Sequence, residues 1–228
     1  MRKTLRGLMS FALAEGLIDV DPSANVKLVP VKDTGGFETW PVDRIEQYRA
    51  RHKLGTRSRL ALELLYGTMQ RRGDVVLLGR QHIHGGILSL RQQKSGAQVD
   101  VPVLPELQAA IDAMPEVRHL TFLVTELGKP FTAAGFGGWF RDQCNEAGLP
   151  KNLSAHGLRK AGATRLAEHG CTDHEIMAWG GWSSLKEVQR YTKSANRKRL
   201  ALQAAGKLKD GTELANLETR LANQENKP

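Results

Sequence analysis

Residues 154–192 read SAHGLRKAGATRLAEHGCTDHEIMAWGGWSSLKEVQRYT, and this stretch decides which fold the chain adopts. Its apolar residues recur at helical spacing, which predicts three consecutive helices over 155–169, 173–179 and 185–192. Residues that commonly cap helices precede each of them: Ser154, Thr172 with Glu175, and Ser184 with Glu187. The stretch therefore predicts that this part of the fold is helical.

The same stretch holds side chains suited to catalysis. His156 and Arg159 lie three residues apart, so a helix places them on one face. Gly180-Gly181-Trp182 follows, and Tyr191 comes nine residues after Trp182. A histidine and an arginine at this spacing most often form an ordinary surface pair. The pair therefore gains meaning only from residues elsewhere in the chain.

Upstream, an arginine stands at the end of a predicted buried helix. Residues 57–69 place apolar side chains on one face, and Arg71 follows directly. Asp74, three residues further on, can orient the guanidinium of Arg71, because a buried arginine needs an acidic partner. A purely structural salt bridge is the alternative, and it is favoured if this segment is considered alone.

Between these regions the chain alternates like a β-hairpin. Strands are predicted over 87–91 and 98–103, with Lys94-Ser95-Gly96 as the turn, which leaves Lys94 exposed. Further helices are predicted over 41–51, 106–114, 133–147 and 196–209, and Trp139, Phe140 and Trp179 are expected in the core. The predicted class is mainly α with a small antiparallel β-sheet (α+β).

The N-terminal segment is predicted to belong to a different domain. Residues 4–17 form an amphipathic helix that Asp21-Pro22 ends, and Pro30, Gly35 and Gly36 mark a linker. One short helix cannot bury its apolar face alone. We therefore expect residues 1–25 to be the terminal helix of a truncated N-terminal domain. The linker is placed at 26–37, the main domain at 38–205 and a C-terminal tail at 206–228.

The charge of the chain indicates a polyanionic partner. The formal net charge is +9 and the pI is about 9.8. Clustered cations bind a phosphate backbone well, because each neutralised phosphate releases condensed counterions. A solvated helix face is the ordinary alternative. Six basic residues surround Tyr191 with Glu187 as the one acid among them: Lys186, Arg190, Lys193, Arg197, Lys198 and Arg199.

Other features argue against several classes of protein. The two cysteines, Cys144 and Cys171, form no paired motif, so no disulfide framework is expected and both are predicted to be reduced and buried. The apolar runs are far shorter than a membrane span, and no signal-like segment follows Met1. We expect a soluble, cytoplasmic protein. Two short groups supply too few ligands for a metal site: His82 with His84, and His169 with Cys171 and His174.

Taken in order, these motifs resemble those of the tyrosine site-specific recombinases, the phage integrase family. That family combines an arginine in a Thr-Gly-x-Arg-x-x-Glu-like segment, a hairpin lysine, a His-x-x-Arg box, a Gly-His or Gly-Trp element and a tyrosine nine residues beyond. The match runs from about Glu38 to Lys193. The resemblance implies the integrase catalytic-domain fold for residues 38–205, and the last helix of a core-binding domain for residues 1–25.

The resemblance also implies a function. The chain would cleave and rejoin double-stranded DNA through a 3′-phosphotyrosine intermediate, as a homo-oligomer that forms a tetramer on recombining sites. No cofactor, metal or membrane is implied. The implied roles are that Arg71 and Arg159 bind the scissile phosphate, His156 and Trp182 complete the pocket, Lys94 is the general acid, Tyr191 is the nucleophile and Asp74 supports the arginines.

Phosphodiester chemistry suits these residue types. Two fixed guanidiniums stabilise the extra negative charge of a pentacoordinate transition state, and a positioned ammonium helps the alkoxide to leave. A free tyrosine has a pKa of about 10, so it needs a base or nearby cations to attack, and His156 can accept its proton. Three positions depart from the family pattern without removing a catalytic group: Met69 for glycine, Asp74 for glutamate and Lys160 for histidine.

Three other functions are compatible with parts of the sequence. A weakly active or inactive DNA-binding remnant of an integrase would keep the fold without turnover. A type IB topoisomerase resembles recombinases at the same pocket but relaxes supercoils as a monomer. A helix-turn-helix regulator would explain the charge, but it would not explain why Arg71, Lys94, His156, Arg159 and Tyr191 occur together.

Overall fold

The computed structural model describes residues 2–26, 36–115 and 119–225, with the side chains of 2–3, 194–195, 198 and 209–225 left out of the description. The chain divides into two compact units, Met1–Gly36 and Phe37–Pro228, and each is described by itself. Residues 27–35 of the predicted linker lie outside the described residues. None of the described helices is long and apolar enough to cross a membrane.

The first unit contains helix α1 (Arg2–Ala14). The helix ends three residues before Leu17, where the sequence pattern places its end. Gly16 explains the difference, because it adopts the left-handed conformation (φ 66°) and Leu17 N–H then donates to the carbonyl of Ala12 at 2.8 Å. Exposed apolar side chains remain along this segment, including Leu8 and Phe11.

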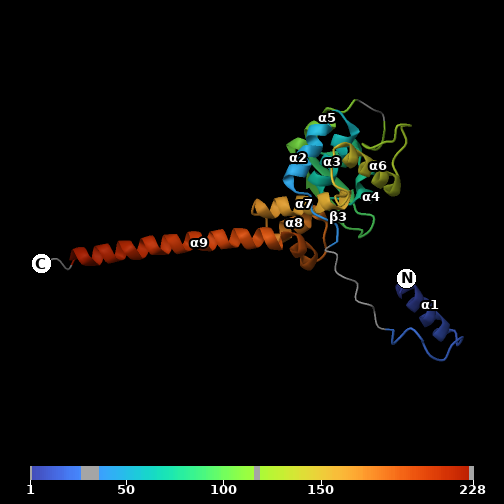
Figure 1. The fold of residues 1–228 in the computed structure, drawn as a ribbon, viewed down its shortest axis with the longest axis horizontal. Coiled ribbons are helices and arrows are strands. Elements are labelled where there is room, and N and C mark those ends of the chain that lie inside the picture. Colours follow the sequence, from blue (N-terminus) through green and yellow to red (C-terminus); the bar gives the residue numbers. More distant parts are fainter. Residues whose placement is uncertain (1, 27–35, 116–118, 226–228) are drawn as a thin grey trace. The chain divides into compact units, whose positions relative to one another are not determined.

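The second unit is mainly helical with a small antiparallel sheet, which confirms the predicted class (Figure 1). The sheet has the order β1-β2-β3, and β2 (Ile87–Arg91) pairs with β3 (Gln98–Pro102) as the predicted hairpin. Strand β1 (Ile83–His84) was not predicted, because two residues are too few to show alternation. The helices are α2 (Val42–Arg51), α3 (Arg57–Thr68), α4 (Arg72–Val75), η1 (Arg80–His82), α5 (Pro105–Asp112), α6 (Ala133–Glu146), α7 (Ala155–Glu168), α8 (Asp173–Gly180) and α9 (Leu185–Glu225).

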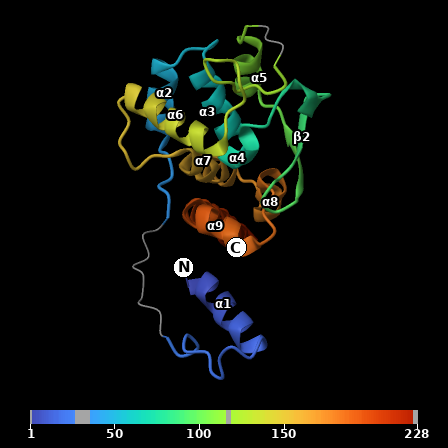
Figure 2. The same cartoon turned by 90° about the vertical axis from the view of Figure 1, so that its right-hand side faces the viewer.

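Helix α3 lies at the centre of this unit. Leu60, Leu64 and Leu65 are fully buried, and the helix packs against α5 and α7. The rings of Tyr48 and Phe140 stack beside it with their centroids 5.6 Å apart. As predicted, Phe140 is buried, while Trp139 and Trp179 pack against the core with part of each ring exposed. Figure 2 shows the strands beside this helical bundle and α7 between the bundle and α9.

Helix α9 differs from the prediction in its length. Two helices with a break near residue 194 were expected, but the structure has one helix from Leu185 to Glu225. The segment Lys193-Ser194-Ala195 contains neither glycine nor proline, so nothing in it ends a helix. The buried side chains of Val188 and Thr192 hold the first turns of α9 against α7 and α8.

Two smaller expectations need correction. Ser154 occupies the N-cap position of α7, but its side chain makes no capping hydrogen bond, whereas Thr172 and Glu175 form the predicted capping box of α8. Cys144 is a buried free thiol as expected, but Cys171 is half-buried, because it lies in the turn between α7 and α8.

Candidate active site

Arg71 is placed by a tight turn at the end of α3. The backbone of Met69 adopts the left-handed conformation (φ 54°), which residues other than glycine rarely do, and Arg71 follows at the N-cap of α4. The side chain of Met69 fits because residue 162 on α7 is glycine; a Cβ there would lie 2.5 Å from Met69 Cγ. The Nη1 atom of Arg71 then donates to Oε1 of Gln92 at 2.8 Å.

Arg159 is a buried cation with an unused donor. Its side chain on α7 is 3% exposed, its Nη1 donates to the carbonyl oxygen of Met69, and its Nη2 is buried without a hydrogen-bond partner. Burial, and then the nearby charge of Arg71, lowers the pKa of Arg159 to about 10. A buried guanidinium beside another cation is a site that favours a bound anion.

Trp182 supports the guanidinium of Arg159. The Cζ atom of Arg159 lies 4.0 Å from the centroid of the Trp182 ring, which is 7% exposed. The two glycines before Trp182 make room for this arrangement. A Cβ on Gly180 would lie 2.0 Å from the ring, and a Cβ on Gly181, which has a left-handed φ of 67°, would lie 2.4 Å from Gln92 Nε2.

Gln92 joins three parts of the site from within the core. Its side-chain amide donates to Gln70 Oε1 at 2.7 Å and to the carbonyl of Gly180 at 2.8 Å. Its oxygen accepts from Arg71 and from the hydroxyl of Ser95 at 2.6 Å. Ser95 lies next to Lys94 in the hairpin turn, where Lys94 is exposed as predicted. One buried side chain therefore ties Arg71, the lysine hairpin and the end of α8 together.

Asp74 does not contact Arg71 in the way that the sequence suggested. Its Oδ1 accepts from the backbone N–H of Gln93 at 2.9 Å, and its Oδ2 is buried without a hydrogen-bond partner. Among the described residues, no ion pair or hydrogen bond joins the Asp74 carboxylate to Arg71. The carboxylate therefore anchors the hairpin beside Lys94, and Gln92 orients Arg71.

His156 lies in the first turn of α7 and is half-buried. Burial is the main cause that lowers its pKa to about 4, and Arg159 and Lys160 add to the effect. The ring is therefore neutral at pH 7. The ring of Phe37 lies 4.8 Å from it, and the carbonyl of Phe37 accepts a hydrogen bond from Lys160 Nζ.

Tyr191 packs on the same side of the domain as these residues. Its ring centroid is 5.7 Å from that of Trp182, and Lys160 Nζ lies 5.6 Å from its centre. Its backbone carbonyl accepts from the hydroxyl of Thr164 at 3.3 Å. The ring is half-buried and packs against the smaller core cluster, which contains Met69 and Trp182.

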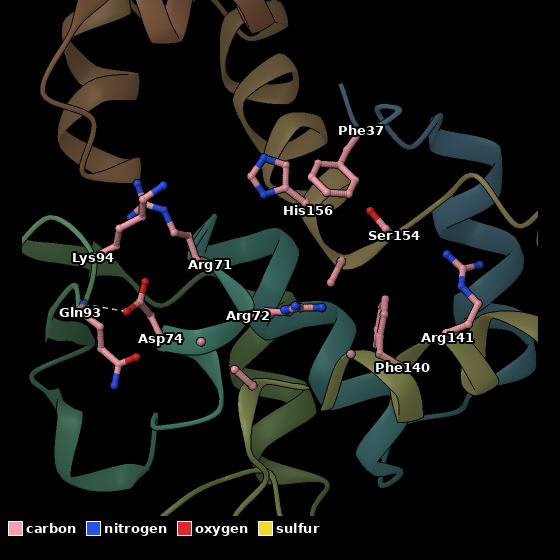
Figure 3. Close-up of a pocket in the computed structure, with 14 residues that line it drawn as sticks. Phe37, Arg71, Arg72, Asp74, Gln93, Lys94, Phe140, Arg141, Ser154 and His156 are labelled. Atoms are coloured by element: carbon pink, nitrogen blue, oxygen red, sulfur yellow. Dashed lines mark hydrogen bonds between the residues drawn. The ribbon is translucent and has the colours of Figure 1, made fainter. Parts of the chain in front are cut away.

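A cavity of about 510 Å³ brings together part of the predicted site. Arg71, Lys94, Asp74 and His156 line it, as Figure 3 shows. The remaining three predicted residues do not line this cavity and form an adjoining group of contacts: Arg159, Trp182 and Tyr191.

The predicted DNA-binding residues lie outside this cavity. Lys186, Arg190, Lys193 and Arg197 are exposed and follow one another at helical spacing, so they form a stripe along α9. At about 100° per residue, the stripe lies roughly 100–160° around the helix from Tyr191. Arg199 is half-buried, and the side chain of Lys198 lies outside the description.

Two residues of the site were not predicted from the sequence. Gln92 has no motif of its own, and a buried amide is recognisable only from its partners. Lys160 was noted only as a departure from a family pattern, yet it contacts both Phe37 and the ring of Tyr191. Its position directly after Arg159 was the one available signal.

This fold is shared with solved integrases. A lambda integrase fragment (residues 75–356), solved as a dimer bound to a COC′ core site, aligns with a TM-score of 0.71 and 24% identity over 84% of this chain and 71% of that one. The Tn1549 transposon integrase, bound to a circular intermediate DNA, aligns with a TM-score of 0.67 and 18% identity over 88% of this chain and 77% of that one.

The chain belongs to the phage integrase family, whose model matches residues 41–198. It is similar to the tyrosine recombinase XerD of Oceanobacillus iheyensis, with 25% identity over 83% of this chain and 68% of that protein. XerD of Mycobacterium leprae is 30% identical over 82% of this chain and 66% of that protein. The chain therefore spans about two thirds of the length of these relatives.

Proposed function

We propose that this chain is a site-specific DNA recombinase that cleaves and rejoins double-stranded DNA through a 3′-phosphotyrosine at Tyr191. The observation that carries the proposal is the buried guanidinium of Arg159, with an unpartnered Nη2 and Arg71 nearby. Such a pair is costly without an anion, and a phosphodiester supplies one. Family membership supports recombinase activity.

In the proposed reaction, the phenol oxygen of Tyr191 attacks phosphorus and the bond from phosphorus to the 5′ oxygen breaks. His156, which is neutral at pH 7, accepts the phenol proton, and the bound phosphate must then offset the burial and the nearby cations that lower the pKa of the free ring to about 4. Lys94 donates a proton to the leaving 5′ oxygen. Arg71 and Arg159 bind the non-bridging oxygens as charge builds up on them. A 5′ hydroxyl of another strand reverses the steps.

We further propose that the chain acts as a homo-oligomer on DNA. Lambda integrase has been solved as a dimer on a core site and as a tetramer on a Holliday junction. The side chains of Leu200, Leu202 and Leu208 on α9 are 55%, 65% and 73% exposed, which suits docking on a neighbouring subunit. Deleting residues 201–228, which removes Leu202 and Leu208, should then reduce cooperative binding to a two-site duplex, and unchanged cooperativity would reject this docking.

The test is to trap the covalent intermediate. The full chain is incubated with a pool of nicked duplexes of random sequence, in which the short fragment that carries the freed 5′ hydroxyl diffuses away after cleavage. A covalent adduct is recognised because it survives denaturant and is removed by protease. The DNA of the adducts is then sequenced to find the site. Tyr191→Phe removes only the attacking oxygen, so it should fold normally and form no adduct. An adduct that persists in this variant would refute the assignment of Tyr191.

A further inference from the structure

The cavity of the candidate site, about 510 Å³ in volume, extends beyond the predicted catalytic residues. Arg71, Lys94 and His156 lie toward one end, and the cavity continues across the first turn of α4 to the side chains of Arg72 and Arg141. In Figure 3, Arg72 extends toward Phe140 and away from Arg71.

Arg72, which is exposed, and Arg141, which is half-buried, supply the positive charge at this end. Among the described residues, no ion pair or hydrogen bond holds the guanidinium of Arg72, which lies over α6 where a Cβ on Gly137 would be 2.4 Å from Nη1. Arg141 donates from Nη1 to the carbonyl of Pro150 at 3.4 Å, which leaves its charge uncompensated. Among the residues that the structure describes, Asp74 supplies the one carboxylate of the cavity lining, and it anchors the hairpin at the other end.

A buried hydroxyl completes this set of donors. The Oγ of Ser154 is buried without a hydrogen-bond partner, although the residue lines the cavity. Its carbonyl is already used, since it accepts from Trp40 Nε1 at 2.8 Å. Guanidiniums and a hydroxyl are all hydrogen-bond donors, and arginine pairs with phosphate through two parallel bonds.

We propose that the Arg72–Arg141 end of the cavity binds a second backbone phosphate, next to the scissile phosphate on the strand that Tyr191 attacks. The proposal rests on the proposed function for the identity of the strand. A DNA strand carries one phosphate per about 3.4 Å of helix axis, so consecutive residues such as Arg71 and Arg72 can serve neighbouring phosphates. This second phosphate site positions the strand, while the reacting atoms lie at the first.

The test combines salt dependence with neutral phosphates. Arg72→Gln and Arg141→Gln are compared with Arg80→Gln, an exposed arginine outside this cavity. On a generic 30-base-pair duplex, the slope of log affinity against log salt should fall by about 0.9 for each lost contact and stay unchanged in Arg80→Gln. Unchanged slopes in both cavity variants would overturn the proposal, even if no cleavage is ever observed.

The second readout locates the phosphate. In the duplex recovered by covalent trapping, each phosphate near the cut is replaced in turn by a neutral methylphosphonate. At the position adjacent to the scissile phosphate, the replacement should weaken binding of the unmodified protein about tenfold, the size of one charged hydrogen bond. It should have a smaller effect on Arg72→Gln and none on the Arg72→Gln/Arg141→Gln double variant, which lacks both guanidiniums of the site. Equal losses in both proteins at every position would reject the second phosphate site, whereas absence of any adduct would reject the proposed function instead.

Discussion

Gly180→Ala is expected to disturb the site through one misplaced ring. The added Cβ would lie 2.0, 2.3 and 2.7 Å from three atoms of Trp182. Carbon atoms in contact prefer about 3.5–4.0 Å, so the ring must move by roughly 1.5 Å. Overpacking of this kind costs about 1–3 kcal/mol, of which better helix propensity returns about 0.5–1 kcal/mol. The free energy of unfolding should fall by about 1–2 kcal/mol.

The same substitution should slow DNA cleavage, because the ring supports Arg159 from 4.0 Å away. A displacement near 1 Å in a catalytic group costs about 100-fold. The assays are chemical denaturation and single-turnover cleavage at saturating protein. Gly138→Ala on α6 is the matched control, since nothing lies within 4 Å of its Cβ, and it should stabilise the protein by about 0.5–1 kcal/mol.

A double-mutant cycle separates the clash from other effects of the extra methyl group. With Trp182→Ala in place, Gly180→Ala should cost nothing, because the atoms that it meets are gone. An equal penalty with and without the Trp182 ring would refute the reasoning.

Three further predictions follow from the charged and polar groups. Arg159→Met should reduce the rate of single-turnover cleavage at least 100-fold, because it removes a charge that stabilises the transition state. The free energy of unfolding should stay unchanged or rise by about 1 kcal/mol, since an uncompensated buried charge is removed. A variant that still cleaves DNA but is less stable would show that the role of Arg159 is structural. The folded pKa of His156 is about 4 against 6.5 unfolded, so the unfolded state binds more protons between these values and stability falls as pH drops through that window. The shift in pKa corresponds to about 3 kcal/mol, which solvent screening of the half-exposed ring reduces to about 1–2 kcal/mol. In denaturation curves at pH 7 and 4.5, His156→Asn should therefore lose less unfolding free energy than the unmodified protein. Equal losses in both proteins would assign the pH dependence to other groups. Gln92→Glu keeps the acceptor for Arg71 but loses both hydrogen bonds that the amide donates, so the unfolding free energy should fall by about 1–3 kcal/mol. The control is Gln93→Glu, at the exposed neighbouring residue, which should not lower the unfolding free energy. Equal stability of the two variants would show that Gln92 has no structural role.

Local sequence patterns were enough for most of the fold. The helices α3, α6 and α7 and the β2–β3 hairpin follow from periodicity and turn residues, which act over a few neighbours. The end of α1 depends on a single left-handed residue, Gly16, within an otherwise helical pattern. The unbroken course of α9 depends on the absence of a helix breaker, which is weaker evidence than the presence of one.

The site was only partly predictable from the sequence. Its reactive side chains stand in short motifs, so their types and order are visible without a structure. Their supports are contacts across the fold: Gln92 reaches Gly180 over 88 positions, and the carbonyl of Met69 reaches Arg159 over 90. Asp74 shows the resulting error. Its spacing from Arg71 suggested an ion pair, but Arg71 donates to the side-chain amide of Gln92, and the Asp74 carboxylate accepts from the backbone N–H of Gln93 in the hairpin.

Helix α9 runs through Tyr191 without a break. The direction in which its distal part, from Leu200 onward, faces is therefore fixed relative to the direction of Tyr191. Each residue added between them turns the distal part by about 100° and lengthens the helix by about 1.5 Å. One alanine inserted after Lys193 would point Leu200 and Leu208 to another side of the helix. Seven inserted residues would restore their direction to within about 20° and move them about 10 Å further away. The packing of the first turns of α9 on α7 and α8 thus sets the direction in which the distal part would meet a neighbouring subunit.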